Sequence, residues 1–213
     1  MGIFRAEYAE AAAGKGFFSV VLSGGGTPIP FLRELAAQKG LDWSRIFFFF
    51  ADERLVDRKS KNSNFRAAND LLFSKAPIPR SNIFAVPVSK GPGAAAAYEK
   101  MVWGFFKSRG GRLSFDLVFL GLGTEGHTAS LFPGSPALRE KKKLAVSTLA
   151  PAYAPPRKRI TLTLIALNSA KTAVFLVAGK EKKEILTALA SAKKNLPASR
   201  IRPAETLHLL YAE

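Results

Sequence analysis

The chain has 213 residues, of which 47% are hydrophobic and 23% charged, a balance typical of a soluble globular protein with a sizeable core. The absence of cysteine excludes disulfides, zinc–thiolate sites and thiol nucleophiles, and no apolar run approaches the ~20 residues that cross a bilayer. The N-terminus lacks the apolar core of a secretory signal, so we expect a cytoplasmic protein without a membrane partner. The net charge of +16 is informative about binding partners and not about the fold.

The first part of the chain predicts a helix, a strand and a glycine loop that opens a second helix. An alanine-rich stretch predicts a helix over residues 5–13, and a β-branched and aromatic run predicts a strand over residues 17–22. Residues 23–28, Ser-Gly-Gly-Gly-Thr-Pro, follow directly, and Pro28 suits the first turn of a helix that runs until Gly40. In this layout, backbone N–H groups and a helix N-terminus can hold an anion.

A second apolar strand, predicted over residues 45–50, is followed after Ala51 by the charged residues Asp52, Glu53 and Arg54. We interpret these charges as functional rather than as ordinary solvent-facing loop residues. The other predicted elements are helices over residues 64–72, 94–107 and 179–194 and strands over residues 82–88, 115–120, 144–149, 159–164, 174–178 and 206–211. The strand over residues 159–164 alternates cleanly and is expected to be half exposed.

Strands that alternate with helices favour an α/β fold with a doubly wound, mostly parallel sheet and helices on both faces. The chain shows no internal repeat and no linker, so we expect a single domain over residues 1–213.

The most informative stretch is residues 115–134, an apolar strand followed by a glycine-rich loop. The loop contains Gly-x-Gly-x-x-Gly at Gly121, Gly123 and Gly126, which alone would suggest a dinucleotide-binding site. Pro133 and Gly134 end the long helix that such a site needs, and no acidic residue stands about 20 positions on. The glycine loop of residues 23–28 has neither that spacing nor the spacing of a P-loop. We therefore reject nucleotide binding at both loops.

His127 directly follows the last of these glycines, where a ligand beyond the carboxyl end of the strand would lie. Histidine titrates near neutrality and is the commonest general base. A buried histidine satisfied by backbone groups is the alternative, but the glycines and the neighbouring Glu125 favour the functional interpretation. His208, within an alternating C-terminal run, has no such context and is expected to be structural.

These motifs together resemble the family of glucosamine-6-phosphate isomerases and 6-phosphogluconolactonases, and within it they resemble the lactonases. The resemblance covers nearly the whole chain from about residue 5, in the same order. Its four motifs are residues 23–28, residues 52–54 with Ser63-Asn64, residues 121–134 and residues 159–163.

The resemblance implies hydrolysis of 6-phospho-D-glucono-1,5-lactone, the second step of the oxidative pentose phosphate pathway, with no metal or organic cofactor. We expect the protein to be a monomer. The resemblance also implies that His127 activates water, and that Arg54 contacts substrate at the same site. Asp52 and Glu125 complete the implied catalytic group. The implied substrate-binding residues, which hold the phosphate or approach the ligand, are Gly24, Gly25, Gly26, Thr27, Gly123, Arg159 and Lys182.

Two positions depart from the family pattern, because Glu125 stands where the family usually has Asp and Gly26 replaces a usual Ser. The nearest alternative function is that of the related aminosugar-phosphate deaminases. Those enzymes carry a Glu five residues after the histidine, where this chain has Phe132, and a Tyr where it has Arg54, so the lactonase is favoured.

A non-catalytic alternative is a sugar-phosphate sensor or a nucleic-acid-binding module. The basic residues are dispersed, with the clearest cluster at residues 139–143, and no nucleic-acid-binding motif accompanies them. We therefore expect a solvated basic surface, a sugar-phosphate lactone as the small-molecule partner, and no specific nucleic acid.

Overall fold

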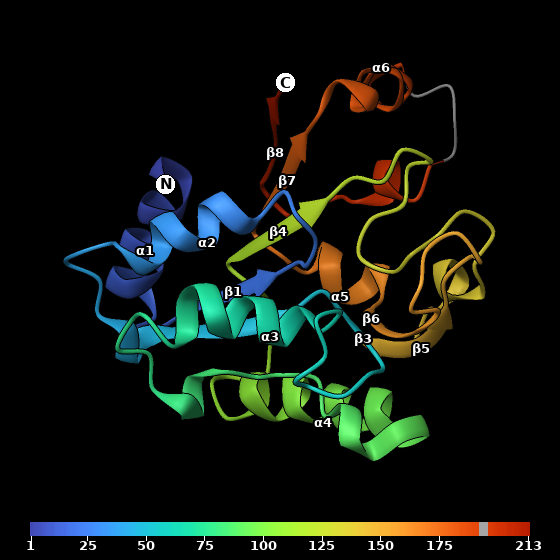
Figure 1. Cartoon of the computed structure of the whole chain (residues 1–213). Coiled ribbons are helices and arrows are strands. Elements are labelled where there is room, and N and C mark those ends of the chain that lie inside the picture. Colours follow the sequence, from blue (N-terminus) through green and yellow to red (C-terminus); the bar gives the residue numbers. More distant parts are fainter. Residues whose placement is uncertain (192–195) are drawn as a thin grey trace.

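The computed structural model describes residues 1–191 and 196–213, which are built around a five-stranded sheet (Figure 1). The strand order is β2-β1-β4-β7-β8, and all neighbouring strands are parallel. The strands are β1 (Phe18–Leu22), β2 (Ile46–Phe50), β4 (Leu117–Gly121), β7 (Thr172–Ala178) and β8 (Thr206–Ala212). Each overlaps a strand predicted from the sequence, and the predicted α/β class with a mostly parallel sheet is confirmed.

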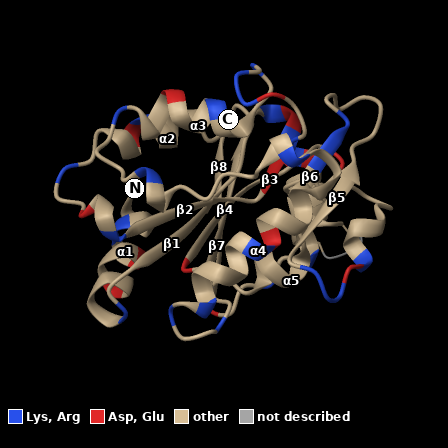
Figure 2. Cartoon of the chain, turned by 90° about the horizontal axis from the view of Figure 1, so that it is seen from below, with Lys and Arg blue, Asp and Glu red and all other residues tan. Residues whose placement is uncertain are grey.

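Helices lie on both sides of this sheet, as Figure 2 shows. They are α1 (Gly2–Gly14), α2 (Ile29–Ala36), α3 (Asn64–Ala68), α4 (Ala94–Lys107), α5 (Leu164–Asn168) and α6 (Lys183–Ala190). A π-helical turn, Asn69–Phe73, continues α3, and 3₁₀ turns span Trp43–Arg45, Arg80–Asn82, Val88–Gly93, Pro136–Arg139, Lys180–Lys182 and Ala198–Arg200. The sequence predicted a helix over residues 179–194, and the last part of that range, residues 192–195, lies outside the described residues.

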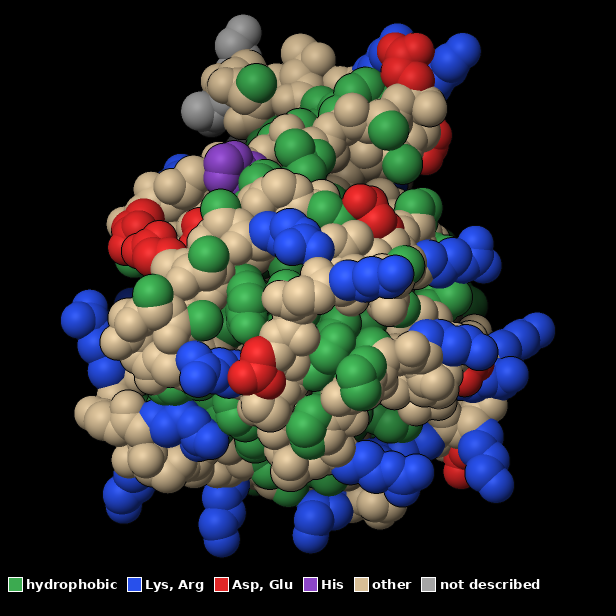
Figure 3. All heavy atoms as spheres, turned by 90° about the vertical axis from the view of Figure 1, so that its left-hand side faces the viewer, with side chains coloured by type: hydrophobic (Ala, Val, Ile, Leu, Met, Phe, Trp, Pro, Cys, Tyr) green, Lys and Arg blue, Asp and Glu red, His purple; other side chains and the backbone are tan. Residues whose placement is uncertain are grey.

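The basic side chains are spread over the surface. Figure 2 shows Lys and Arg on helices and loops around the molecule, and Figure 3 shows them scattered over one face with Asp and Glu between them. Glu140 accepts the backbone N–H groups of Lys141, Lys142 and Lys143, so the densest basic cluster in the sequence wraps around a carboxylate.

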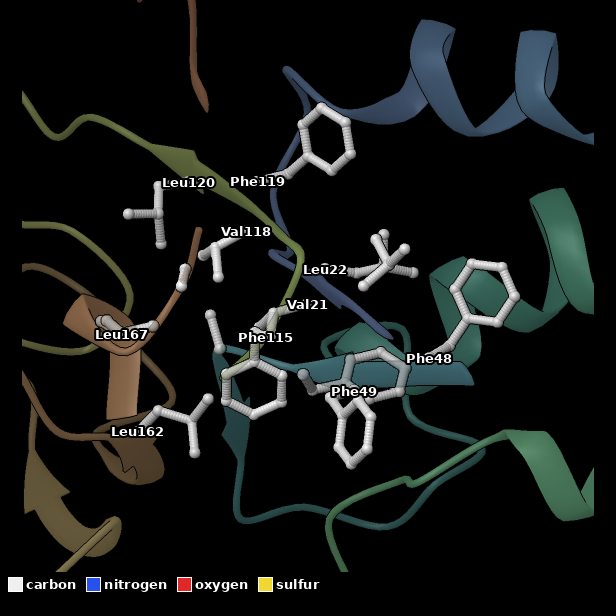
Figure 4. Close-up of a cluster of buried hydrophobic side chains, with 14 of the residues drawn as sticks. Val21, Leu22, Phe48, Phe49, Phe115, Val118, Phe119, Leu120, Leu162 and Leu167 are labelled. Carbon is white, nitrogen blue, oxygen red and sulfur yellow. The ribbon is translucent and has the colours of Figure 1, made fainter. Parts of the chain in front are cut away.

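Phenylalanines fill both faces of the sheet, and Figure 4 shows part of this core around β1, β2 and β4. On one face, aromatic contacts join α1, α2 and α3 to the strands through the pairs Phe4–Phe18, Phe31–Phe119 and Phe50–Phe65. On the other face, Phe105 and Phe106 of α4 contact Phe49 of β2. Strands buried on both faces need near-continuous apolar runs, which explains the Ile-Phe-Phe-Phe-Phe sequence of β2.

A second, three-stranded antiparallel sheet was not predicted. Its order is β3-β6-β5, with β3 (Asp52–Arg54), β6 (Lys158–Leu162) and β5 (Ala145–Leu149). The prediction that residues 159–164 are half exposed was wrong, because β6 is the middle strand of this sheet and residues 159–162 are buried. The register sets Asp52 opposite Thr161 and Arg54 opposite Arg159, so the charged stretch after β2 is itself a short strand.

The strand predicted over residues 82–88 was also wrong. Ile83 makes only an isolated parallel bridge with Phe48 of β2, and Pro87 has no N–H to continue a ladder. The Asn82 side chain instead donates to the carbonyls of Trp43, Ser44 and Ile46, which fastens this segment to the end of β2.

The order of the five strands places a crevice between β1 and β4. The chain leaves β1 toward β2 on one side and leaves β4 toward β7 on the other, which makes this a topological switch point. Ligands of open α/β sheets bind beyond the carboxyl ends of strands at such a point. Both glycine loops, residues 23–28 after β1 and residues 122–126 after β4, begin there.

Candidate active site

A cavity of about 220 Å³ opens at this switch point. It joins the two glycine loops to the second sheet and to the turn after β7. Its walls are formed by Ser23, Gly24, Gly25, Thr27, Pro28, Asp52, Arg54, Gly121, Leu122, Gly123, His127, Ala129, Arg159 and Lys182. Nine of the eleven candidate residues therefore meet at one cavity, while Gly26 and Glu125 are not part of its lining.

The first glycine loop presents its backbone to this cavity. Gly25 has a φ of +99°, a conformation that side-chain-bearing residues rarely adopt. Helix α2 begins just beyond, with Pro28 at its N-cap, and the Ile29 N–H closes the turn onto the Gly26 carbonyl. Among the described residues, no acceptor is found for the N–H groups of Gly25, Gly26 and Thr27. Free N–H groups at a helix N-terminus are suited to an anionic ligand.

The second glycine loop folds the His127 ring back over Gly123. The Gly126 N–H donates to the Gly123 carbonyl and the Gly123 N–H donates to the His127 carbonyl, each at 2.9 Å. A Cβ on Gly123 would stand 2.0 Å from His127 Nδ1, so only glycine leaves room for the ring. Phe132 stacks against the other side of the imidazole, with 4.4 Å between ring centroids.

Glu125 holds the imidazole through a hydrogen bond of 2.9 Å between its Oε1 and His127 Nδ1. An ionised carboxylate can only accept, so Nδ1 carries the proton and Nε2 is left as the basic nitrogen. The same Oε1 accepts the Tyr153 hydroxyl at 2.9 Å. Partial burial opposes the charged carboxylate, but the Glu125 backbone N–H, His127 and Tyr153 together hold the pKa of Glu125 below its usual value.

Asp52 is buried at the wall of the cavity, and its carboxylate connects three segments. It accepts the Ser130 hydroxyl and the Asn64 amide, the latter at 3.1 Å, and lies 3.8 Å from Arg159 Nη1. Ser130 belongs to the loop that carries His127, and Asn64 belongs to α3. Asp52 thus ties the histidine loop to the second sheet.

The charged residues beside Asp52 have different surroundings. Glu53 is buried away from the cavity and accepts the N–H groups of Asn64 and Phe65 at the start of α3, and burial raises its pKa. Arg54 points one Nη toward the Asn62 carbonyl at 2.8 Å, while its buried Nε has no partner among the described residues. Arg54 therefore keeps donor capacity beside the cavity.

Arg159 lies at the cavity and also at the base of the loop between β5 and β6. Its Nε donates to the Pro156 carbonyl at 2.9 Å and its Nη2 to the Ala154 carbonyl at 2.8 Å. Burial lowers its pKa, opposed by the charge of Asp52, but the guanidinium stays protonated. Lys182 ends the 3₁₀ turn after β7 and also lines the cavity.

The sequence analysis did not predict the supporting contacts of three residues, namely Ser130, Asn64 and Tyr153. Ser130 is three residues beyond His127 and Asn64 starts a predicted helix, so their position near the site could have been inferred. Tyr153 comes from a loop without any motif, and nothing in the sequence alone connects it to Glu125. Within residues 1–191 and 196–213, no cluster of three or more His, Asp or Glu side chains could hold a metal ion, and no helix is long and apolar enough to span a membrane.

Comparisons with known proteins place the chain in one family. The family model described as glucosamine-6-phosphate isomerases/6-phosphogluconolactonase matches residues 3–210. A 6-phosphogluconolactonase of Thermotoga maritima is 40% identical over 190 residues, which are 87% of this chain and 80% of the relative. An Arabidopsis thaliana protein named 6-phosphogluconolactonase 3, chloroplastic, is 37% identical over 202 residues, covering 90% of this chain and 62% of the relative.

The fold comparison agrees with the sequence comparison. A crystal structure of 6-phosphogluconolactonase from Thermotoga maritima superimposes with a TM-score of 0.87 at 36% identity, covering 100% of this chain and 93% of that one. Nearly the whole chain is therefore matched in both sequence and fold. The chain belongs to the glucosamine-6-phosphate isomerase/6-phosphogluconolactonase family.

Proposed function

We propose that the chain hydrolyses 6-phospho-D-glucono-1,5-lactone to 6-phospho-D-gluconate. The observation that carries this proposal is the His127–Glu125 pair at a cavity that also contains Arg54, Arg159 and Lys182. A basic nitrogen beside a cluster of cations suits an anionic substrate whose reaction requires an activated water. The named activities of the relatives support the same reaction.

The reaction begins with a water molecule held by His127. Nε2 takes a proton from this water while its oxygen attacks the lactone carbonyl carbon, which gives a tetrahedral oxyanion. Collapse of the oxyanion breaks the bond between that carbon and the ring oxygen, and the imidazolium returns the proton to the departing oxygen. The products are a carboxylic acid, which ionises, and a free hydroxyl, and the histidine ends as it began. Glu125 stabilises the imidazolium between these two transfers.

The phosphate is placed at the first glycine loop. Gly24, Gly25, Gly26 and Thr27 supply backbone N–H groups, and Lys182 and Arg159 supply positive charge. Arg54 is assigned to the lactone end, because it lines the cavity and its guanidinium can stabilise the developing oxyanion. Asp52 orients Arg159 and the histidine loop through its contacts with Arg159 and Ser130.

The related deaminase reaction is disfavoured by what surrounds the imidazole. Phe132 stacks on His127 and supplies no carboxylate for opening a sugar ring. The Glu125 carboxylate is engaged by His127 and Tyr153 and lies outside the cavity lining.

The deciding experiment is an assay on freshly generated 6-phosphogluconolactone, corrected for spontaneous hydrolysis. The chain should accelerate hydrolysis, while His127→Ala, purified identically, should not. Incubation with glucosamine 6-phosphate should release no ammonia. Ammonia release, or equal lactone hydrolysis by both proteins, would contradict the proposal.

We further propose that residues 1–213 form one lactonase domain that acts as a cytoplasmic monomer in the oxidative pentose phosphate pathway, without a specific nucleic-acid or membrane partner. The dispersed basic side chains support only weak binding to polyanions (Figure 3). Light scattering should give one chain per particle, and any binding to nucleic acid should vanish as salt is raised.

A further inference from the structure

Tyr153 is joined to the proposed catalytic pair by a direct hydrogen bond. Its hydroxyl donates to Glu125 Oε1 at 2.9 Å, the same oxygen that accepts His127 Nδ1–H. The tyrosine side chain is otherwise exposed, with 69% of its surface open to solvent, and it does not line the cavity. Such a residue has no core to stabilise, so its contact with Glu125 is its main interaction with the rest of the protein.

The loop that carries Tyr153 is closed at its base. The Ala150 N–H donates to the Arg157 carbonyl at 2.8 Å, and the Arg157 Nε donates back to the Ala150 carbonyl at 3.0 Å. The loop of residues 150–157 therefore leaves and re-enters the second sheet at one point, between β5 and β6.

Arg159 holds the same loop next to its tip. It binds the carbonyl of Ala154, the residue directly after Tyr153, and that of Pro156. A guanidinium at the cavity wall thus fixes the backbone from which Tyr153 reaches Glu125. The position of the hydroxyl is set by this tether rather than by chance contact of a surface side chain.

We propose that Tyr153 is a positioning residue for the lactonase reaction, which acts by fixing the rotamer of Glu125 and through it the tautomer of His127. This inference rests on the proposed function for its kinetic effect. A partly exposed carboxylate can swing away from a partly exposed imidazole, whereas a further side-chain donor from a tethered loop restricts it. With Glu125 fixed, Nδ1 keeps the proton and Nε2 stays basic toward the cavity.

Tyr153→Phe removes only the hydroxyl and tests this role. We expect kcat to fall by roughly three- to tenfold, a minor part of a general base's contribution, with KM within about twofold of the parent. The ¹⁵N signals of the two histidines give a second readout that needs no substrate. The His127 signals should move toward the tautomer that carries its proton on Nε2, and those of His208 should stay unchanged.

Tyr8→Phe is the matched control, because within residues 1–191 and 196–213 the Tyr8 hydroxyl has one hydrogen bond, which it accepts from the Asp42 N–H, and Tyr8 belongs to α1. It should leave both kcat and the His127 signals unchanged. In a Glu125→Gln background, Tyr153→Phe should have little further effect, since both changes act on one interaction.

Three results would overturn the proposal: parental kcat with unmoved His127 signals in Tyr153→Phe, lowered kcat with unmoved signals, or full additivity with Glu125→Gln. The second would make Tyr153 a substrate contact instead. If the parent protein itself showed no lactonase activity, the proposed function would fail, while the ¹⁵N measurement would still report whether Tyr153 controls the His127 tautomer.

Discussion

The side chain of Asn64 occupies the space directly beside Gly24. A Cβ on Gly24 would stand 1.8 Å from Asn64 Oδ1, while the Asn64 amide nitrogen donates to both the carbonyl and the carboxylate of Asp52. One buried amide therefore touches the proposed phosphate loop and the charged strand β3 at once. The missing side chain of Gly24 is what allows the two to approach.

Gly24→Ala should push this amide aside and destabilise the protein by about 1–3 kcal/mol, the usual cost of overpacking a buried site. Lactone hydrolysis should fall as well, because Asp52 loses a partner. Adding Asn64→Ala should recover part of the lost melting temperature by making room for the new methyl group. The matched control is Gly104→Ala, within α4, where an added Cβ would meet no described atom within 4 Å apart from its chain neighbours and the nearby helix backbone, and alanine should stabilise by about 0.5–1 kcal/mol. A Gly24→Ala protein as stable as the parent would contradict the crowding.

His127→Gln should lower kcat by roughly 10²–10⁴-fold while the melting temperature stays close to that of the parent, since the half-exposed ring is replaced by a polar side chain of similar reach. His208→Gln, a change of the only other histidine, in β8, should hydrolyse the lactone at the parental rate. Equal losses in the two variants would remove the basis for assigning the base.

Glu125→Gln keeps the shape of the side chain and removes its charge. Turnover should fall roughly tenfold, a fraction of the general base's contribution, because the imidazolium formed during the reaction loses its counter-charge. Glu125→Asp should retain most of the activity if the shorter carboxylate still reaches Nδ1. Parental turnover in the Gln variant would show that Glu125 is only a surface charge.

The same substitution gives a prediction about stability and pH. Folding lowers the pKa of Glu125, despite partial burial, so its ionised form contributes stability that is present above pH 4.5 and is lost as pH falls through the lowered value. The parent should melt at a higher temperature than Glu125→Gln above pH 4.5, and the two melting temperatures should converge in more acidic solution. A difference that persists or grows on acidification would contradict the assignment.

Lys182→Ala should raise KM for the phosphorylated lactone and barely change the slow turnover of unphosphorylated gluconolactone, because the lysine is assigned to the phosphate alone. Arg159→Ala should raise KM too, but it should also lower kcat, since Arg159 tethers the loop of residues 150–157. Lys180→Ala provides the control, because Lys180 is exposed in the same turn and does not line the cavity. Equal effects of Lys182→Ala on both substrates would place the phosphate elsewhere.

Much of the parallel sheet could be predicted from the sequence because strands buried on both faces leave a strong signal. Phe47 to Phe50 and Val118 to Leu120 can only be accommodated between two layers of helices, and the glycines that follow them indicate where a ligand approaches. Residues from four separate segments then meet at one cavity, because the loops that carry them lie near the switch point between β1 and β4. The resemblance to a known family supplied the individual roles.

The second sheet could not be predicted, because the charged residues of β3 and the alternating pattern of β6 indicate exposed segments, whereas most of these residues are buried. β3 consists of three charged residues, and Asp52 and Glu53 are buried because Ser130, Asn64 and the start of α3 satisfy their carboxylates. Thr161 is wholly buried, although its alternation with Ile160 and Leu162 suggested an exposed face, because its hydroxyl accepts the Ser130 N–H. Partners that come from distant parts of the chain decide such cases, and no local pattern contains them.

Because Arg54 and Arg159 lie opposite one another on neighbouring strands, binding of an anionic ligand should raise the stability of the folded state. Two guanidinium groups on directly opposed positions of an antiparallel pair repel one another, and the charges of Asp52 and Glu53 offset part of that repulsion at Arg159. A phosphorylated ligand would add the missing negative charge, and at a hundred times its dissociation constant it would stabilise the folded state by about 2.7 kcal/mol. In a cell that degrades unfolded chains, the abundance of this protein would therefore rise with the supply of the metabolite it consumes.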